Sequence, residues 1–204
     1  MGITLYGNSC SPCTMNLMVL LTEKEVEYEM VTVDYLSNEH KKPPYSDMNP
    51  FGQIPIFQDG DLVLFESRAI AAYIAEKYRD KGTPLLGNTV EEAAMVRVWV
   101  DVGANHFEPA ANPIILEQTS NWDYGTELNQ AVVDENVKKL EKVYDAYEIQ
   151  LSKTKYLAGD FFSLADLLHI NPIDKLTYTS AGSLLDDRPH LKAWWDDICS
   201  RPSY

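Results

Sequence analysis

The first 78 residues carry strand and helix patterns in an order that few folds accommodate. Short apolar runs typical of strands begin at Ile3, Tyr28, Ile54 and Leu62. A helical pattern follows the first, second and fourth of these runs, and Asp59-Gly60 between the last two predicts a hairpin. The order strand, helix, strand, helix, strand, strand, helix therefore predicts one four-stranded mixed sheet.

This arrangement is thioredoxin-like, and the strand patterns end with it. Residues 79–89 are rich in residues that break helices and strands and predict a linker. Beyond the linker only helical patterns occur, over 90–118, 127–152, 164–179 and 191–200. Ser163 and Asp166 have the spacing of a capping box and predict the start of a buried helix. We therefore expect an α/β thioredoxin-like domain over 1–78 and an all-α domain over 90–204.

The chain is strongly acidic, with 17 Lys and Arg against 31 Asp and Glu and a net charge of −14. A protein with this charge repels phosphate backbones and anionic lipid surfaces, so we expect no nucleic-acid and no membrane partner. No apolar run approaches the roughly 18 residues that a membrane span needs. The N-terminus has no signal-peptide pattern and the cysteine count is odd, which together predict a cytoplasmic location.

Two of the three cysteines lie in the turn between the first strand and the first helix, as Cys10-Ser11-Pro12-Cys13. Proline suits the first helical position, which makes Ser11 the natural N-cap. A helix N-terminus lowers the pKa of a thiol placed there, and a hydroxyl at the same place can donate to a bound thiolate. A capped turn with incidental cysteines is the alternative. Cys199 lies far along the chain without a partnering cysteine pair, so we expect no zinc site and no other metal.

Gln53-Ile54-Pro55 precedes a strand, at a place where the corresponding proline of thioredoxin-like folds is cis. Such a turn leaves the N–H and C=O of Ile54 to pair with an extended peptide ligand, as an added strand does. An ordinary proline on an edge strand is the alternative.

Two further segments suit a ligand with several charges. We expect Ser67 to cap a helix whose N-terminus binds a carboxylate, with Glu66 beside it to meet an ammonium group. His40-Lys41-Lys42 is a basic cluster that suits another carboxylate. A capped helix without a ligand and a solvated charged face are the respective alternatives.

Together these segments resemble the glutathione transferases, and most closely the plant phi class. The resemblance covers nearly the whole chain and rests on residues 39–42, 49–55, 65–70, 73–78, 156–160, 163–167 and 193–195. It implies a cytoplasmic detoxification enzyme, a homodimer, that uses glutathione as co-substrate. Its reaction would be attack of the glutathione thiolate on a small hydrophobic electrophile, with peroxide reduction as a side activity.

The resemblance also implies the contacts of each part of glutathione. Ser11 falls at the position of the catalytic serine, whose hydroxyl hydrogen-bonds the thiolate. The implied binding residues are Glu66 and Ser67 for the γ-glutamyl end, Gln53, Ile54 and cis Pro55 for the cysteinyl part, and His40 and Lys41 for the glycyl carboxylate.

The electrophile pocket is expected against the helical domain. The candidates, by position in the resemblance, are Tyr35, Phe107, Ile114 and Tyr178. For each of them a place in the core is the alternative.

The cysteines beside Ser11 depart from the phi pattern and leave three functions open. The first is Ser11-assisted conjugation. The second is thiol transfer or dehydroascorbate reduction by Cys10 with Cys13 as a resolving partner, since the omega and lambda classes use a cysteine at the serine's position. The third is a ligand carrier with little turnover, because a fold does not fix a function.

Overall fold

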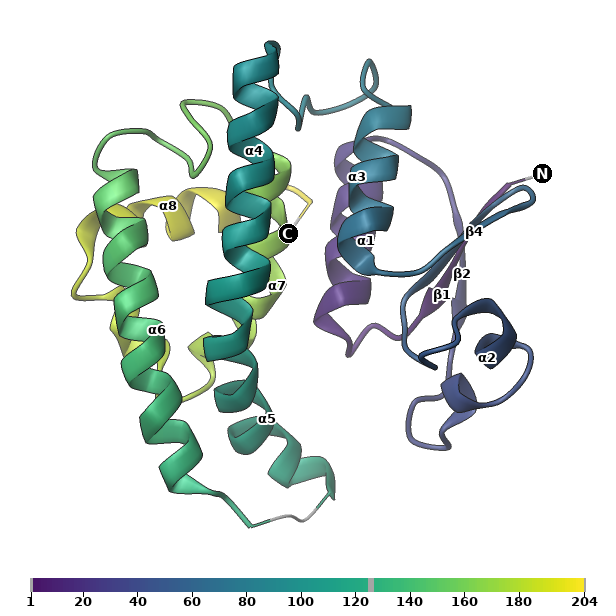
Figure 1. The fold of residues 1–204 in the computed structure, drawn as a ribbon, viewed down its shortest axis with the longest axis horizontal. Helices are drawn as coiled ribbons and strands as arrows, with labels where there is room; N and C mark the ends of the chain where they lie inside the picture. The colour runs from purple at the N-terminus through teal and green to yellow at the C-terminus, as the bar shows by residue number, and fades with distance from the viewer. Residues whose placement is uncertain (1, 125–126, 204) are drawn as a thin grey trace. The chain divides into compact units, whose positions relative to one another are not determined.

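The computed structural model describes residues 2–124 and 127–203 (Figure 1). The chain divides into two compact units, Met1–Leu85 and Leu86–Pro202. We call them the α/β unit and the helical unit. The division falls inside the segment 79–89 that was expected to be a linker.

The α/β unit contains one four-stranded sheet. Its strands are β1 (Ile3–Gly7), β2 (Glu29–Thr32), β3 (Ile56–Asp59) and β4 (Leu62–Leu64). Its helices are α1 (Pro12–Glu23), the short 3-10 helix η1 (Glu39–Lys41), α2 (Tyr45–Met48) and α3 (Ser67–Lys77). The strand order is β2-β1-β3-β4, with β1 parallel to β2 and every other pairing antiparallel. The predicted mixed sheet and its thioredoxin-like arrangement are confirmed.

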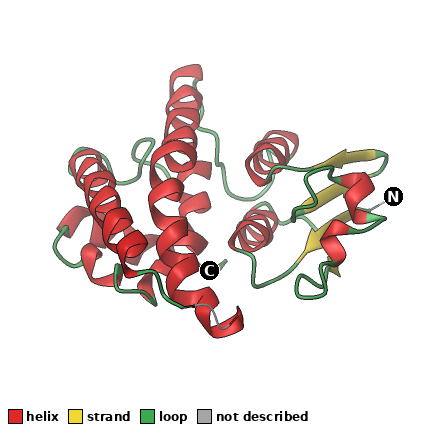
Figure 2. Cartoon of the chain, turned by 60° about the horizontal axis from the view of Figure 1, so that its bottom comes forward, coloured by secondary structure: helices red, strands yellow, loops and turns green. Residues whose placement is uncertain are grey.

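Different helices cover the two faces of this sheet (Figures 1 and 2). Leu5 of β1 and Phe57 of β3 are register partners and are fully buried, and the Phe57 ring meets Tyr73 of α3 edge-on at 6.1 Å. On the opposite face Ile56 packs with Tyr45 of α2 in a second buried cluster. Successive residues of β3 thus face opposite sides, as the pleat of a strand requires.

The segments that carry the predicted glutathione and catalytic residues all meet the sheet at one edge. Gly7 at the end of β1 is the register partner of Thr32 at the end of the parallel strand β2. The start of β3 and the end of β4 lie at the same edge, because both antiparallel pairings reverse the chain direction. This edge therefore carries the turn into α1 and the segments 33–41, 52–55 and 65–68.

The helical unit contains no strand among its described residues. Its elements are α4 (Val90–Val102), the π-helical stretch η2 (Gly103–Phe107), α5 (Glu108–Tyr124), α6 (Gln130–Leu151), α7 (Leu164–Thr177), the 3-10 helix η3 (Gly182–Leu185) and α8 (Pro189–Cys199). The helical patterns are confirmed, and the first continues through η2 into α5. No described helix combines the length and the apolar character that crossing a bilayer would require.

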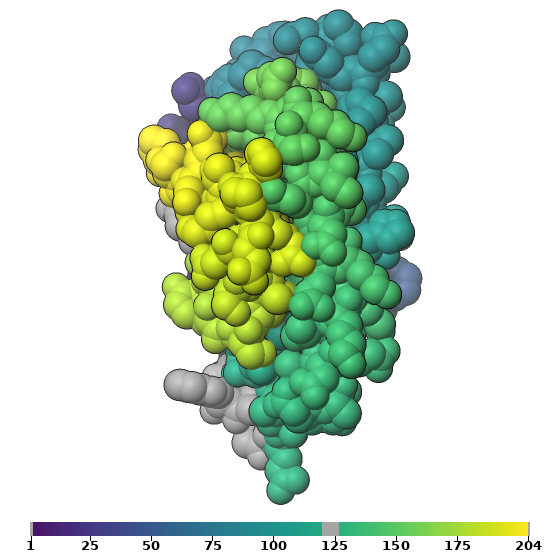
Figure 3. Space-filling model, turned by 90° about the vertical axis from the view of Figure 1, so that its left-hand side faces the viewer, coloured from purple at the N-terminus to yellow at the C-terminus, as the bar shows by residue number. Residues whose placement is uncertain are grey.

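Helices α6 and α8 lie side by side on one face of the helical unit (Figure 3). Arg188, just before α8, donates from Nε and Nη2 to Asp145 of α6 at 2.8 and 2.7 Å. Glu148 of α6 accepts hydrogen bonds from the backbone N–H groups of His190 and Leu191. A side chain of α6 thus satisfies N–H groups in the first turn of α8 that have no partner within the helix.

The predicted capping box at the start of α7 is confirmed and extends into the core. Asp166 is fully buried and accepts from both the N–H and the hydroxyl of Ser163, at 2.9 and 2.6 Å. It also accepts from the Leu157 N–H at 3.0 Å and from Nε1 of Trp194 at 2.9 Å. Burial raises the pKa of Asp166, and the four hydrogen bonds act in the opposite direction.

Gly7 leaves no room for a side chain. A Cβ there would lie 2.6 Å from both Cγ2 and Oγ1 of Thr14, which is fully buried in α1. We expect Gly7→Ala to lower the free energy of unfolding by about 1–3 kcal/mol because it overpacks this contact. Thermal unfolding by calorimetry measures the change, and Gly2→Ala, which meets nothing within 4 Å, is the control.

Adding Thr14→Ala to Gly7→Ala should recover part of the lost stability. It removes both contacting atoms, and Thr14 Oγ1 has no hydrogen-bond partner in the part of the chain that the structure describes. Strictly additive losses from the two substitutions would contradict steric conflict as the cause.

Asp166→Asn should destabilise the helical unit strongly. The amide group replaces one acceptor oxygen by a donor, so buried donors lose their acceptor at about 1–3 kcal/mol each. Asp196→Asn is the matched control, because its exposed ion pair with Lys192 contributes at most about 1 kcal/mol. Equal shifts of Tm for the two variants would show that the Asp166 hydrogen bonds do not support the unit.

Candidate functional site

The N-terminus of α1 forms the first part of the site. The predicted N-cap is confirmed, because Oγ of Ser11 accepts from the Thr14 N–H at 3.4 Å. The Ser11 hydroxyl therefore keeps its own proton to donate to a ligand. The N–H of Cys10 donates to Oδ1 of Asn8 at 2.9 Å, which fixes the turn and leaves the Cys10 residue exposed.

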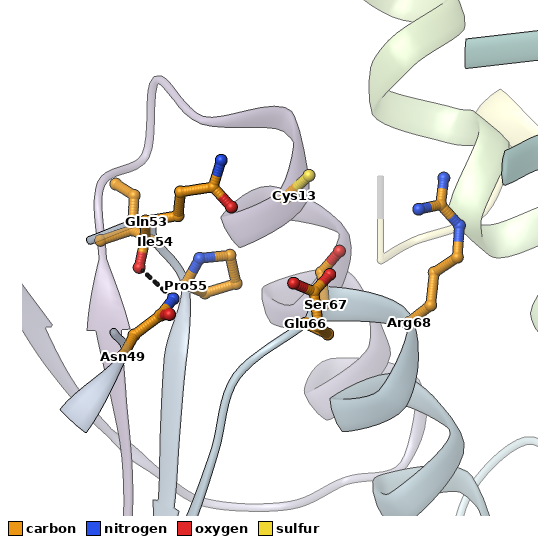
Figure 4. A pocket seen from close by; sticks show the side chains of 8 residues that line it. All are labelled: Cys13, Asn49, Gln53, Ile54, Pro55, Glu66, Ser67 and Arg68. Carbon is orange, nitrogen blue, oxygen red and sulfur yellow. Dashed lines mark hydrogen bonds between the residues drawn. The ribbon is translucent and has the colours of Figure 1, made fainter. Parts of the chain in front are cut away.

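A pocket of about 110 Å³ lies in the α/β unit, lined from several elements (Figure 4). Its lining residues are Cys13, Asn49, Gln53, Ile54, Pro55, Glu66, Ser67 and Arg68. The structure thus brings together six residues predicted for the site. Ser11, Cys10, His40 and Lys41 are not in this lining, although Ser11 lies only two residues before Cys13.

The segment before β3 is held in place by Asn49, for which the sequence predicts no role of its own. Asn49 is 2% exposed and donates from Nδ2 to the Gln53 carbonyl at 2.9 Å (Figure 4). Its Oδ1 accepts from the Phe51 N–H at 3.0 Å. The Ile54-Pro55 peptide is cis, as expected. No described residue hydrogen-bonds the backbone of Ile54, so its N–H and C=O stay available to a ligand.

Helix α3 begins one residue away from where the sequence predicted. Ser67 is its first residue rather than its cap, and Glu66 occupies the N-cap position with φ 70° and ψ 103°. The helix cannot include Glu66 because its φ is positive, a conformation uncommon for residues other than glycine. Such a backbone costs about 1–3 kcal/mol and occurs preferentially at functional sites.

His40 is a buried part of the predicted basic cluster. The residue is 3% exposed, and its imidazole stacks on the Tyr35 ring with centroids 4.3 Å apart. Burial, and next the charge of Lys41, lowers the pKa of His40, which favours the neutral ring. The positive charge of the cluster therefore lies mainly on Lys41 and Lys42.

Lys41 lies against the segment that leads to the pocket. Its Nζ donates to the Phe51 carbonyl at 3.2 Å, and its Cδ would be 2.8 Å from a Cβ at Gly52. Gly52 has φ +54°, so both its conformation and this close approach suit glycine. The Lys41 side chain thus lies against Gly52, the residue directly before Gln53.

The four candidates for the electrophile pocket have different surroundings. Phe107 and Ile114 are 1% and 0% exposed, which favours the core alternative for both. Phe107 packs in an aromatic cluster with Tyr144, Tyr147 and His169. Tyr178 is 77% exposed, and Tyr35 covers His40 in the α/β unit.

Arg68 lines the pocket although it was not among the residues predicted for the site. In the sequence, the one indication of a site role for Arg68 was its position directly after Glu66 and Ser67, in a segment typical of the resembled family. Across residues 2–124 and 127–203, no group of three or more His, Cys, Asp or Glu side chains is arranged to hold a metal ion.

Known proteins share this architecture over the full chain. The family model described as the glutathione S-transferase N-terminal domain matches residues 1–76, and that of the C-terminal domain matches residues 104–202. The chain is 47% identical to glutathione S-transferase F13 of Arabidopsis thaliana, covering 100% of this chain and 94% of that protein.

Two solved structures are similar as well. Glutathione transferase F7 from Populus trichocarpa is 48% identical with a TM-score of 0.96, covering 98% of this chain and 95% of that one. Glutathione S-transferase I from maize, solved with an atrazine glutathione conjugate, is 45% identical with a TM-score of 0.91, covering 100% and 94%. The chain belongs to the glutathione S-transferase family and is close to its plant phi class.

Proposed function

We propose that this chain is a cytoplasmic enzyme that joins the thiolate of glutathione to small hydrophobic electrophiles. The observation that carries the proposal is the pocket of Gln53, Ile54, Glu66 and Ser67 in the same unit as the Ser11-capped N-terminus of α1. The glutathione conjugate bound to the maize relative supports the same chemistry. A homodimer, as in the resembled family, is part of the proposal.

The pocket residues suit the γ-glutamyl end of glutathione. The Glu66 carboxylate meets the ammonium group, and Ser67 with the N-terminus of the 11-residue helix α3 meets the carboxylate. The N–H and C=O of Ile54, beside Gln53, pair with the cysteinyl part as a short added strand. His40 and Lys41 receive the glycyl carboxylate.

Local groups must supply this binding, because the net charge of −14 repels an anionic ligand. Helix N-termini and the ammonium of Lys41 act over short distances. The field of the whole chain is screened beyond about 8–10 Å at physiological salt. Capture of glutathione is therefore a property of this edge of the sheet rather than of the surface as a whole.

The chemical step needs a thiolate, and a free thiol is only a few per cent ionised at neutral pH. The Ser11 hydroxyl donates a hydrogen bond to the sulfur, and the N-terminus of α1 adds its partial positive charge. Both lower the pKa of the bound thiol. The thiolate then forms a carbon–sulfur bond with the electrophile, and the leaving group departs with its electron pair. Attack of the same thiolate on a peroxide oxygen breaks the O–O bond, releases the alcohol and leaves a sulfenic acid of glutathione. A second glutathione converts it to the disulfide and water, which completes the peroxidase reaction.

Thiol exchange is the second candidate, and the geometry changes which cysteine is favoured for it. Cys13 lines the pocket, whereas Cys10 is exposed and outside the lining. A mixed disulfide with glutathione would therefore form on Cys13 more readily than on Cys10. A ligand carrier with little turnover is the third candidate.

Three variants separate these functions. Ser11→Ala should lower kcat/KM for a model aromatic halide by about 10- to 100-fold, because it removes a hydrogen bond to a charged sulfur. Cys10→Ser and Cys13→Ser should keep conjugation within about twofold, since neither supplies that bond. Reduction of a mixed disulfide is measured in parallel.

Intact conjugation in Ser11→Ala, together with its loss in either cysteine variant, would overturn the serine mechanism in favour of thiol exchange. Negligible turnover in both assays, with glutathione still bound by the wild-type chain, would identify a carrier.

Substitutions of Glu66 should separate stability from binding. Glu66→Gly relieves the positive φ and should stabilise the chain by about 1 kcal/mol while weakening glutathione binding. Glu66→Gln keeps the backbone strain and removes the charge, so it should weaken binding with little change in Tm. Calorimetry measures both quantities. Glutathione affinity equal to wild type in both variants would show that Glu66 does not hold the γ-glutamyl end.

A further inference from the structure

His40 carries a buried polar atom without a partner. The residue is 3% exposed, and its Nδ1 has no hydrogen-bond partner within the described chain. Most buried polar side-chain atoms in proteins are hydrogen-bonded, so an exception calls for an explanation. The His40 ring is held in this position by something other than a hydrogen bond through Nδ1.

The Tyr35 ring is the neighbour that holds it. The two rings are almost parallel, with an interplanar angle of 5° and centroids 4.3 Å apart. A stacked ring fixes the plane of the imidazole and excludes water from one of its faces. Tyr35 itself is 49% exposed, so it covers His40 from the solvent side rather than joining the core.

The loop that presents Tyr35 is fixed at both ends by its own hydrogen bonds. The Asp34 N–H donates to Oε2 of Glu39 at 2.7 Å, and the Glu39 N–H donates to the Asp34 carbonyl at 3.1 Å. Oδ1 of Asp34 accepts from the N–H groups of Leu36 and Ser37 at 3.0 and 3.2 Å. The position of Tyr35 over His40 is therefore built into the loop.

This environment selects one tautomer of the neutral ring. Among the residues that the structure describes, Nδ1 has no partner in either tautomer, but Nε2 is not among the buried unpartnered atoms, so only a proton on Nε2 can find an acceptor in solvent or in a ligand. The proton therefore resides on Nε2, and the ring offers one N–H donor in a fixed plane. A ligand carboxylate is an acceptor only and is the complementary group.

We propose that Tyr35 is a positioning residue for glutathione: its ring fixes and covers His40, so that Nε2–H is aimed for the glycyl carboxylate. This inference rests on the proposed function. It moves Tyr35 from the electrophile pocket, where the family resemblance had put it, to the glycyl end of the glutathione site.

The first test compares glutathione with γ-glutamylcysteine, which lacks the glycyl residue. Tyr35→Leu should raise the Kd of glutathione by about fivefold, because the His40 side chain must then be ordered on binding. It should leave the Kd of γ-glutamylcysteine unchanged. Tyr35→Phe keeps the stacked ring and should bind both ligands as wild type does.

Leu36→Ala is the matched control. Leu36 is the next residue of the same loop, is 73% exposed, and should not affect the affinity for either ligand. In turnover, Tyr35→Leu should raise KM for glutathione with kcat unchanged at saturation, since it acts on binding alone. Circular dichroism checks that each variant is folded.

The second test determines the tautomer of the His40 ring in the absence of any ligand. Nitrogen-15 chemical shifts of the imidazole, assigned with a His40→Gln variant, should show the proton on Nε2 in the wild-type chain and in Tyr35→Phe. Tyr35→Leu should show a mixture of tautomers. A purely structural role for Tyr35 would leave these shifts unchanged.

Several results would overturn the proposal. One is that Tyr35→Leu weakens the binding of both ligands equally, and another is that it weakens the binding of neither. The third is a wild-type His40 ring that carries its proton on Nδ1. If Tyr35→Leu did not fold, Tyr35→Met, which also removes the ring, would be measured in its place with the same expected results. A wild-type chain that binds no glutathione would instead overturn the proposed function, and the nitrogen-15 shifts would then test the stacking by themselves.

Discussion

The pairing of β1 with β2 on one side and with β3 on the other is the constraint on which the site depends. Parallel pairing places the ends of β1 and β2 together, and the antiparallel pairings bring the start of β3 and the end of β4 to the same edge. Segments up to 60 positions apart in sequence meet there without a long loop. A change of register by one residue would turn every side chain of the shifted strand to the opposite face of the sheet.

Features encoded by neighbouring residues were predictable from the sequence. The Ser11 cap, the hairpin at Asp59-Gly60 and the box of Ser163 and Asp166 each need only residues within four positions of one another. Local hydrogen bonds decide such features, and the residue types that can make them are few. The order of the strands was also predictable, because short connections between strands leave few alternative sheet topologies.

Features decided by the packing of distant residues were not predictable. The helix at Ser67 starts one residue earlier than predicted, and its N-cap Glu66 adopts a positive φ, for which glutamate has no intrinsic preference. Burial of Phe107 and neutrality of His40 depend on rings from other elements or loops. Which cysteine lines the pocket depends on where α1 begins: Cys13 lies in its first turn, whereas Cys10 lies in the turn before the helix and is exposed.

The hydrogen bonds of Asp166 have a consequence for how the helical unit folds. One carboxylate joins the start of its own helix, a loop nine residues earlier and an indole 28 residues later. The local box with Ser163 can form by itself, whereas the hydrogen bonds from Leu157 and Trp194 form only when those segments pack against α7. Full stabilisation of this helix and closure of the core become one cooperative event, so partly assembled forms that expose apolar surface gain little stability of their own.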